Sequence, residues 1–203
     1  MFNVCYRCGL YRPDKEIDPS GPHAICPECG YRQPFAYRPL LIVCGASGAG
    51  KTTILHQLMG RMTAAVLLEG DILYRDGVTN FYELWLRMAK NISQSGRSVV
   101  LFSSGAHPGN IEPCIESRYF SKIAYLALVL DDEQVTARLK ARPAWRGSAE
   151  EESLRGQISY NRWFKAQSSE YADKITLLDT GSQSIKSAAD QVEAWINAQL
   201  STK

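Results

Sequence analysis

The sequence predicts an α/β protein in which five parallel strands form a sheet with helices on both faces, preceded by a small cysteine-rich segment. Three observations support this prediction. Short apolar runs alternate with helix-compatible stretches from residue 40 onward. A glycine-rich loop joins the first of these runs to a helix. Four of the six cysteines occur within the first 39 residues, as two C-x2-C pairs.

Length and composition indicate one main globular domain with a small appendage, since 203 residues with 45% hydrophobic and 22% charged content can bury one substantial core. The N-terminus lacks a basic region followed by an apolar segment, and the longest apolar run, 123–130, is too short to span a bilayer. We therefore expect a cytoplasmic protein without a membrane partner. The 23 basic and 21 acidic residues give a net charge of +2, which neither supports nor excludes a nucleic-acid partner.

The cysteine pairs have the spacing of a zinc ribbon or zinc knuckle. Cys5 and Cys8 form the first C-x2-C-G turn and Cys26 and Cys29 the second, with 17 residues between the turns. Each turn directs two sulfurs at one ion, and the glycine that follows accepts a positive φ. Four thiolates complete a tetrahedral Zn²⁺ site with no position left for substrate, so the site is predicted to be structural.

Two alternatives for the cysteines are a pair of disulfides and a redox-active C-x2-C. A cytoplasmic location disfavours permanent disulfides, and a single redox centre has no use for two such turns. His23 is a further candidate ligand, although a loop histidine is the simpler interpretation. Residues 1–38 are rich in proline and too few to bury much apolar surface, so zinc is expected to take the place of a core.

Strands are expected where near-continuous apolar runs occur, and helices where apolar residues recur every three or four positions. The predicted strands are 40–44, 65–68, 98–102, 123–130 and 175–178. The clearest helices are 53–59, 80–95 and 184–200, and another begins near Glu133. Because the strands are apolar throughout and are separated by helices, they are predicted to be parallel and covered on both faces.

The loop after the first strand, residues 45–52, has the spacing G-x4-G-K-T of a Walker A loop. Its glycines allow backbone N–H groups to surround phosphate oxygens at a helix N-terminus, so ATP is the expected ligand. Lys51 is expected to reach the β- and γ-phosphates, and Thr52 to ligate Mg²⁺. An ordinary turn is the alternative. The predicted nucleotide contacts are Gly45, Ser47, Gly48, Ala49, Gly50, Lys51, Thr52 and Thr53.

Two carboxylates, Glu69 and Asp71, follow the second strand, and ligands of an open α/β sheet bind beyond the carboxyl ends of its strands. We expect one to act on Mg²⁺ through water and the other on the acceptor hydroxyl, with Asp71 as the base or orienting group. A capping role for Asp71 is the alternative. The third strand ends in residues 103–105, which lack the acidic residue that many Walker ATPases use for the metal. Asp131 and Asp132 are expected to cap a helix.

Three arginines stand four residues apart, at Arg138, Arg142 and Arg146. Helical spacing places Arg138 and Arg142 on one face, and Pro143 is expected to end the helix. Guanidinium groups at a helix end and on the loop beyond it suit a lid, residues 138–160, that closes over ATP and neutralises developing charge. Arg142 is the strongest candidate for this role. A solvated basic face is the competing interpretation.

These motifs, in this order, resemble the small P-loop kinases of the nucleoside-monophosphate, shikimate and gluconate kinase group. The matching motifs are the Walker loop, the E-G-D of 69–71, the R-x3-R that begins at Arg138, and residues 178–182. Segments 91–97, 141–146 and 161–164 further look like those of bacterial nucleoside-kinase-like proteins. The resemblance implies a P-loop kinase domain at residues 39–203 with the sheet order 2-3-1-4-5. It also implies that the turn formed by Thr180, Gly181 and Ser182 lies against the adenine.

The function that the resemblance implies is ATP- and Mg²⁺-dependent transfer of the γ-phosphate to a hydroxyl or phosphate of a small molecule, such as a nucleoside, nucleotide or sugar-like metabolite. The acceptor is expected between the second and third strands, where Arg75 is a candidate for binding its phosphate or carboxylate. The alternatives are a zinc-ribbon ATPase module that acts through a protein or nucleic-acid partner, and a kinase of nucleic-acid ends. The near-neutral charge weakens both. The cysteines precede the domain instead of lying in the lid, unlike those of adenylate kinases, so the resemblance does not support assigning the substrate of those enzymes to this chain.

The connector between the last cysteine pair and the first strand contains Pro34, Phe35, Tyr37 and Pro39, and is therefore stiff and aromatic, unlike a Gly/Ser tether. The cysteine-rich segment is expected to pack against the kinase domain. Because the N-terminal end of the central strand lies opposite the nucleotide, the expected docking place is the edge of the sheet away from the phosphates.

Overall fold

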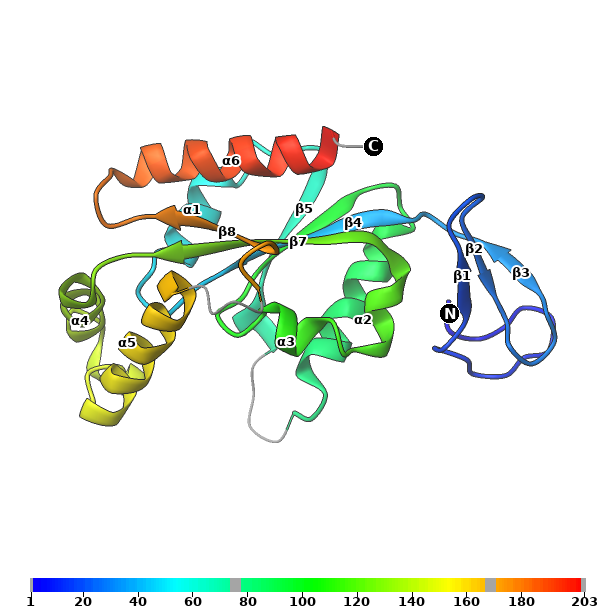
Figure 1. Ribbon diagram of the computed structural model, residues 1–203, viewed down its shortest axis with the longest axis horizontal. Coiled ribbons are helices and arrows are strands. Elements are labelled where there is room, and N and C mark those ends of the chain that lie inside the picture. Colours follow the sequence, from blue (N-terminus) through cyan, green and yellow to red (C-terminus); the bar gives the residue numbers. More distant parts are fainter. Residues whose placement is uncertain (1, 74–77, 167–170, 202–203) are drawn as a thin grey trace.

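The computed structural model describes residues 2–73, 78–166 and 171–201. The chain forms a small antiparallel sheet near its N-terminus and a larger parallel sheet (Figure 1). The small sheet contains β1 (Glu16–Asp18), β2 (His23–Ile25) and β3 (Arg32–Pro34). The large sheet contains β4 (Arg38–Cys44), β5 (Ala65–Glu69), β6 (Ser98–Phe102), β7 (Phe120–Val129) and β8 (Ile175–Asp179).

The α-helices of the described residues are α1 (Lys51–Leu58), α2 (Phe81–Ser93), α3 (Pro108–Ile111), α4 (Asp132–Lys140), α5 (Glu151–Ala166) and α6 (Ile185–Ser201). Short 3-10 helices occur at η1 (Gly70–Leu73), η2 (Ile115–Tyr119) and η3 (Ala144–Arg146). Asp131 is the N-cap of α4, as expected. Glu69 was expected on the loop after the second strand and is instead the last residue of β5. None of the helices described here is both long and apolar enough to cross a membrane.

The large sheet has the order β5-β6-β4-β7-β8, and all neighbouring strands are parallel. Counted from β4 as the first strand, this is the predicted order 2-3-1-4-5. Strand β4 is central, and its Leu41 pairs with Val100 of β6 on one side and Ala124 of β7 on the other. Because the strands are parallel, their carboxyl ends lie at one edge of the sheet, where ligands of such folds bind.

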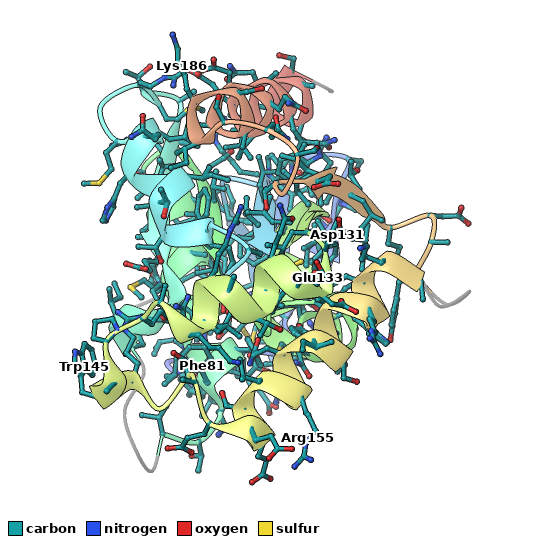
Figure 2. All side chains as sticks on the ribbon, turned by 90° about the vertical axis from the view of Figure 1, so that its left-hand side faces the viewer. Phe81, Asp131, Glu133, Trp145, Arg155 and Lys186 are labelled. Carbon is teal, nitrogen blue, oxygen red and sulfur yellow. The ribbon has the colours of Figure 1, made fainter. Side chains whose placement is uncertain are left out.

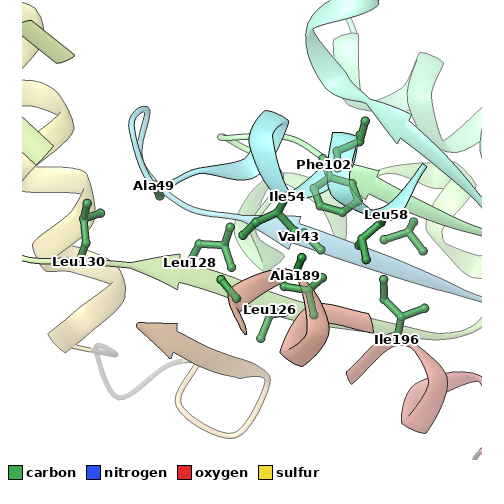
Figure 3. Packing of buried hydrophobic residues seen from close by; sticks show 14 of the residues in the cluster. Val43, Ala49, Ile54, Leu58, Phe102, Leu126, Leu128, Leu130, Ala189 and Ile196 are labelled. Carbon is green, nitrogen blue, oxygen red and sulfur yellow. The ribbon is translucent and has the colours of Figure 1, made fainter. Parts of the chain in front are cut away.

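Alternate residues of β4 pack into two separate cores, because successive side chains of a strand point to opposite faces of the sheet. Leu41 and Val43 belong to a cluster with α1 and α6, whose packing Figure 3 shows. Leu40 and Ile42 belong to a second cluster with α2, α3 and α5. The sheet is therefore covered on both faces (Figure 1), which explains why its strands are apolar throughout.

The N-terminal segment, residues 2–34, is called the ribbon from here on. It packs against the α/β domain at the end of the sheet opposite the carboxyl edge (Figure 1). The ring of Phe2 meets that of Tyr119 edge-on, with centroids 5.3 Å apart. Asn3 donates from Nδ2 to Oε1 of Glu116 over 2.7 Å, and Lys90 donates to both Asn3 and Glu116. The predicted docking of the ribbon is confirmed by these contacts.

Candidate active site

The loop that connects β4 to α1 requires its glycines for conformational and steric reasons. Gly45 has a φ of 131°, and a Cβ at this position would lie 2.4 Å from the carbonyl oxygen of Leu128. Gly48 and Gly50 also have positive φ values, 90° and 99°, which residues with a side chain rarely adopt. The chain thereby curls in front of the N-terminus of α1, where backbone N–H groups and the helix dipole favour an anion.

Lys51 lies folded across this loop. Its Nζ donates to the carbonyl oxygens of Gly45 (2.9 Å) and Ala46 (3.0 Å). Burial lowers the pKa of Lys51 to about 8, so the side chain remains largely protonated at neutral pH. The loop therefore carries a cation where the sequence predicts the phosphates.

Thr52 and Glu69 meet at the end of β5, where Oγ1 of Thr52 donates to Oε1 of Glu69 over 2.6 Å. A hydroxyl and a carboxylate side by side offer the hard oxygen ligands that Mg²⁺ prefers, so this pair fits the predicted metal. Asp71 follows in η1, exposed and on the wall of the cleft. Gly70 allows η1 to approach β6 closely, because a Cβ on it would lie 2.7 Å from Cβ of Ser103.

Arg138 is held between two loops at the carboxyl edge. It lies on α4, and its guanidinium donates to the carbonyl oxygens of Gly48 (3.2 Å) and Thr180 (3.1 Å). Thr180 in turn donates from Oγ1 to the carbonyl oxygen of Ala49 over 2.9 Å. The glycine-rich loop, α4 and the turn after β8 therefore form one hydrogen-bonded unit.

The other two predicted arginines lie beyond the helix. Because α4 ends at Lys140, Arg142 lies beyond the helix. The prediction from the spacing that Arg142 shares a helical face with Arg138 is therefore wrong. Arg146 lies in η3, and both line the cleft. Burial and the charge of Arg146 lower the pKa of Arg142, while the carboxylate of Asp71 opposes that effect. Arg142 and Asp71 are therefore close enough to interact electrostatically.

These side chains surround one cavity of about 360 Å³. Figure 2 views the molecule from the side of α4 and α5, with Trp145 on the segment that joins them. The lining comprises residues 47–54 and Asp71, Ser104, Arg138, Arg142, Arg146, Thr180, Gln183, Ser184, Ile185 and Ala188. Of the described residues that were predicted to bind the nucleotide, Mg²⁺ or the acceptor, Gly45, Glu69, Gly181 and Ser182 do not line the cavity. Residues 183–185 extend the wall that begins at Thr180.

On the side where the acceptor is expected, Arg75 lies outside the described residues. An aromatic group from α5 lies near this part of the cleft: the hydroxyl of Tyr160 donates to the carbonyl oxygen of Ser104 (2.8 Å), and its ring stacks on Trp163 with centroids 5.8 Å apart. His107 packs against Trp163 with centroids 5.0 Å apart, and burial lowers the pKa of His107, so its ring is neutral at neutral pH. The sequence analysis did not place these α5 residues at the site.

A contact that no sequence motif indicates joins α5 to the glycine-rich loop. Oε1 of Gln157 accepts a hydrogen bond from the backbone N–H of Ser47 over 2.7 Å. The two residues are 110 positions apart, and a lone glutamine on a helix carries no recognisable signal. Gln157 is therefore a candidate site residue that only the tertiary structure reveals.

The four cysteine sulfurs of the ribbon lie within 4.8 Å of one another. The Sγ atoms of Cys5 and Cys29 are 3.6 Å apart, and those of Cys8 and Cys26 are 3.9 Å apart. A tetrahedral Zn²⁺ with Zn–S bonds of about 2.3 Å holds its sulfurs about 3.8 Å from one another, so the four cysteines fit this ion. His23 is not part of the group, and its ring faces the carbonyl oxygen of Gly21.

The two C-x2-C turns have the same backbone geometry. The N–H groups of Gly9 and Gly30 donate to the carbonyl oxygens of Cys5 and Cys26, each over 2.9 Å. Both glycines have the predicted positive φ, 73° and 69°. A hydrogen bond from the backbone of Cys8 lowers the pKa of Cys5 to about 6, whereas at Cys29 a hydrogen bond from the backbone of Tyr31 is outweighed by burial and the neighbouring thiols, which raise the pKa of Cys29 to about 11.

Comparison with known proteins shows the fold. No protein-family model matches the sequence, and no curated protein is similar to it in sequence. Among solved structures, the chain is similar to a sugar kinase from Janibacter sp. HTCC2649, with a TM-score of 0.59 and 18% identity over 79% of this chain and 95% of that one. It is also similar to a gluconokinase from Sinorhizobium meliloti 1021, with a TM-score of 0.55 and 15% identity over 81% and 94% of the two chains. At these identities the likeness shows a shared α/β fold, and the activity has to be argued from the site.

Proposed function

We propose that this protein is an ATP- and Mg²⁺-dependent phosphotransferase that transfers the γ-phosphate to a hydroxyl or phosphate of a small molecule. The observation that carries the proposal is the cleft at the carboxyl edge of the sheet, which is lined by a loop of backbone amides, a lysine, a threonine, an aspartate and three arginines, with Glu69 hydrogen-bonded to that threonine. Phosphoryl transfer needs these parts: a phosphate cradle, metal ligands, a group that positions the acceptor, and cations for the transferring group. The likeness to a sugar kinase and a gluconokinase supports a small-molecule acceptor.

Each part of the cleft has a role in this proposal. The loop amides and Lys51 bind the β- and γ-phosphates. Thr52 and Glu69 hold Mg²⁺, which supplies positive charge to the phosphates when it is bound. Asp71 takes the proton of the acceptor hydroxyl, or orients that hydroxyl, while the acceptor oxygen bonds to the γ-phosphorus and ADP leaves. The lid arginines at 138, 142 and 146 stabilise the charge on the transferring phosphate.

The remaining predicted contacts belong to the two substrates. We propose that the turn of Thr180, Gly181 and Ser182 approaches the adenine, and that the cavity wall continues through Ile185, whose exposed apolar side chain suits the face of a base. Arg75 remains the proposed ligand for a phosphate or carboxylate of the acceptor.

We further propose that residues 1–38 form a zinc-stabilised unit and residues 39–203 the kinase domain, with the lid at 138–160. In this arrangement Cys5, Cys8, Cys26 and Cys29 hold a structural Zn²⁺ whose role is stability. We also propose a cytoplasmic location, because a reducing compartment keeps such cysteines available to the metal.

The decisive experiment is a screen for acceptor-stimulated release of ADP. The wild-type protein is mixed with ATP and Mg²⁺ and with panels of nucleosides, nucleotides, sugars and sugar acids, and Lys51→Ala serves as the matched inactive control. We expect one of these classes to raise ADP release in the wild type alone. A protein that binds no ATP would overturn the proposal. Stimulation by nucleic-acid ends or by a protein, with no small molecule active, would favour the alternatives.

A further inference from the structure

Both ends of the lid, residues 138–160, are hydrogen-bonded to neighbouring residues of the phosphate loop. At the first end, Arg138 of α4 donates to the carbonyl oxygen of Gly48 over 3.2 Å. At the second end, Gln157 of α5 accepts from the N–H of Ser47 over 2.7 Å. Two successive residues of one loop therefore hold the two helices that flank Arg142 and Arg146.

Gln157 reaches the loop from a helix that is itself anchored. Leu154 and Asn161, three and four positions away, are buried, so these three residues share the inward face of α5. The side-chain amide of Asn161 accepts from the N–H of Leu130 (3.3 Å) and donates to its carbonyl oxygen (2.7 Å), just after β7 ends. Asn161 thus fixes α5 on the sheet, and Gln157 on the same face meets the loop.

The shape of the loop explains why the N–H of Ser47 is free to bind a side chain. The N–H of Ala49 donates to the carbonyl oxygen of Ala46 over 3.1 Å, and Gly48 has a φ of 90°. These features define a type II β-turn with Ser47 at its second position. The N–H of that position takes no part in the hydrogen bond of the turn, so it needs a partner from elsewhere. Gln157 supplies that partner.

We propose that Gln157 is a positioning residue that couples occupancy of the phosphate loop to closure of the lid. The inference rests on the proposed function, because it requires a phosphate ligand. Phosphate oxygens that bind the loop amides reorient the turn of Ser47 and Gly48, and these two residues hold Gln157 and Arg138. The two ends of the lid then move together, and the arginines between them approach the transferring phosphate. With Arg138 alone, one end of the lid would follow the loop and the other would not.

Trp145 provides a signal of lid position that does not depend on turnover. It lies in η3, is 79% exposed, and has the guanidinium carbon of Arg146 at 5.1 Å from its ring centroid. The other three tryptophans of the described chain lie in α2, α5 and α6. Closure changes the surroundings of Trp145 and hence its fluorescence, and Trp145→Phe identifies the part of the signal that comes from this residue.

Two substitutions remove the same hydrogen bond from opposite sides. Gln157→Met keeps the length of the side chain and removes the acceptor. Ser47→Pro removes the donor at a turn position that favours proline, so the shape of the loop is retained. Because the N–H of Ser47 is also one of the proposed phosphate contacts, the affinity of this variant for the analogue is measured beside that of Gln157→Met. A neutral hydrogen bond contributes about a factor of five to an equilibrium constant. We therefore expect each variant to lower the closure constant, measured from Trp145 fluorescence at a saturating non-hydrolysable ATP analogue, about fivefold.

The double variant Ser47→Pro/Gln157→Met is expected to lose no more than either single variant, because the two changes remove one interaction. Calorimetric titration with the same analogue separates this inference from the proposed function: if the wild type does not bind the nucleotide, the proposed function fails. If the nucleotide binds and the variants keep the full Trp145 response, or if their losses add, the coupling role is overturned. A lower melting temperature with a normal Trp145 response would show a purely structural role for Gln157 and would also overturn it.

Discussion

The junction between the ribbon and the α/β domain contains a buried ion pair, and its contribution to stability can be estimated from the structure. Lys90 and Glu116 form an ion pair in which both side chains are 0% exposed. Asn3 of the ribbon hydrogen-bonds to both, and Arg87 approaches Glu116 from the surface at 3.1 Å. Burial lowers the pKa of Lys90, and the hydrogen bond and charge of Glu116 oppose that effect. The perturbation that we consider is Lys90→Met, which removes the cation and leaves a side chain of similar length.

The expected cost is that of leaving Glu116 buried without its main partner. Breaking a buried ion pair from one side costs about 3–5 kcal/mol, and Arg87 and Asn3 still bind the carboxylate, so we expect the lower end of this range. In a chain of this length each kcal/mol lowers the melting temperature by about 2–4 °C, which gives an expected fall of about 6–12 °C. The double variant Lys90→Met/Glu116→Leu should regain more than half of the loss, because neither charge then has to be desolvated.

Thermal unfolding followed by circular dichroism measures both variants, with urea unfolding as an independent measure of the free energy. Affinity for ATP is the internal control, since the junction lies at the end of the sheet opposite the cleft and should not affect it. If Lys90→Met unfolds at the same temperature as the wild type, the pair is not buried in solution and the ribbon does not dock as described. A double variant that is less stable than Lys90→Met would contradict the desolvation argument.

Three further predictions concern the cleft and the cysteines. Lys51→Ala should abolish transfer while the melting temperature is retained, because it removes a phosphate donor and no core contact; unchanged turnover would exclude the phosphate role of the loop. Asp71→Asn keeps the shape and removes a proton acceptor, so turnover should fall by about 10² or more with little change in ATP binding, whereas a loss of ATP·Mg²⁺ affinity would assign Asp71 to the metal. Cys26→Ser/Cys29→Ser, or removal of zinc by a strong chelator, should lower the melting temperature far more than it alters the Michaelis constant for ATP. Metal content is measured in parallel, and a zinc-free protein of normal stability would refute a structural zinc site.

The features that the sequence predicted well are those that depend on local chemistry. Gly45 and Gly48 need conformations that few other residues adopt, so the loop can be read from its residue types. The strands of the parallel sheet are buried on both faces, and their apolar runs are therefore continuous. The two C-x2-C-G turns repeat one backbone geometry, which local spacing is sufficient to specify. The strand order followed from a resemblance and not from these local patterns.

The features that the sequence missed depend on where distant segments meet. Gln157 contacts the loop because α5 is anchored on the sheet. The residues next to Gln157 in the sequence do not indicate that contact. Arg142 was expected to share a helical face with Arg138, but α4 ends at Lys140, ahead of the proline that was expected to stop it. The carbonyl oxygen of Gly181 accepts a hydrogen bond from Gln134 over 2.9 Å, a contact between α4 and the turn after β8 that the turn sequence does not indicate. Each of these outcomes is set by packing and not by residue type.

The position of the ribbon determines how it can influence the chemistry. In the part of the chain that the structure describes, its hydrogen bonds and ring contacts with the domain involve α2 and the 3-10 helix η2, through Lys90, Glu116, Arg118 and Tyr119. The glycine-rich loop, α4 and α5 are held by one another and by the turn after β8. At its other end, α2 begins at Phe81 and packs in one cluster with Leu73 of η1, the element that carries Asp71. We therefore expect any influence of the ribbon on the cleft to act through α2 on the side of Asp71, and not through the hydrogen bonds that hold the glycine-rich loop, α4 and α5.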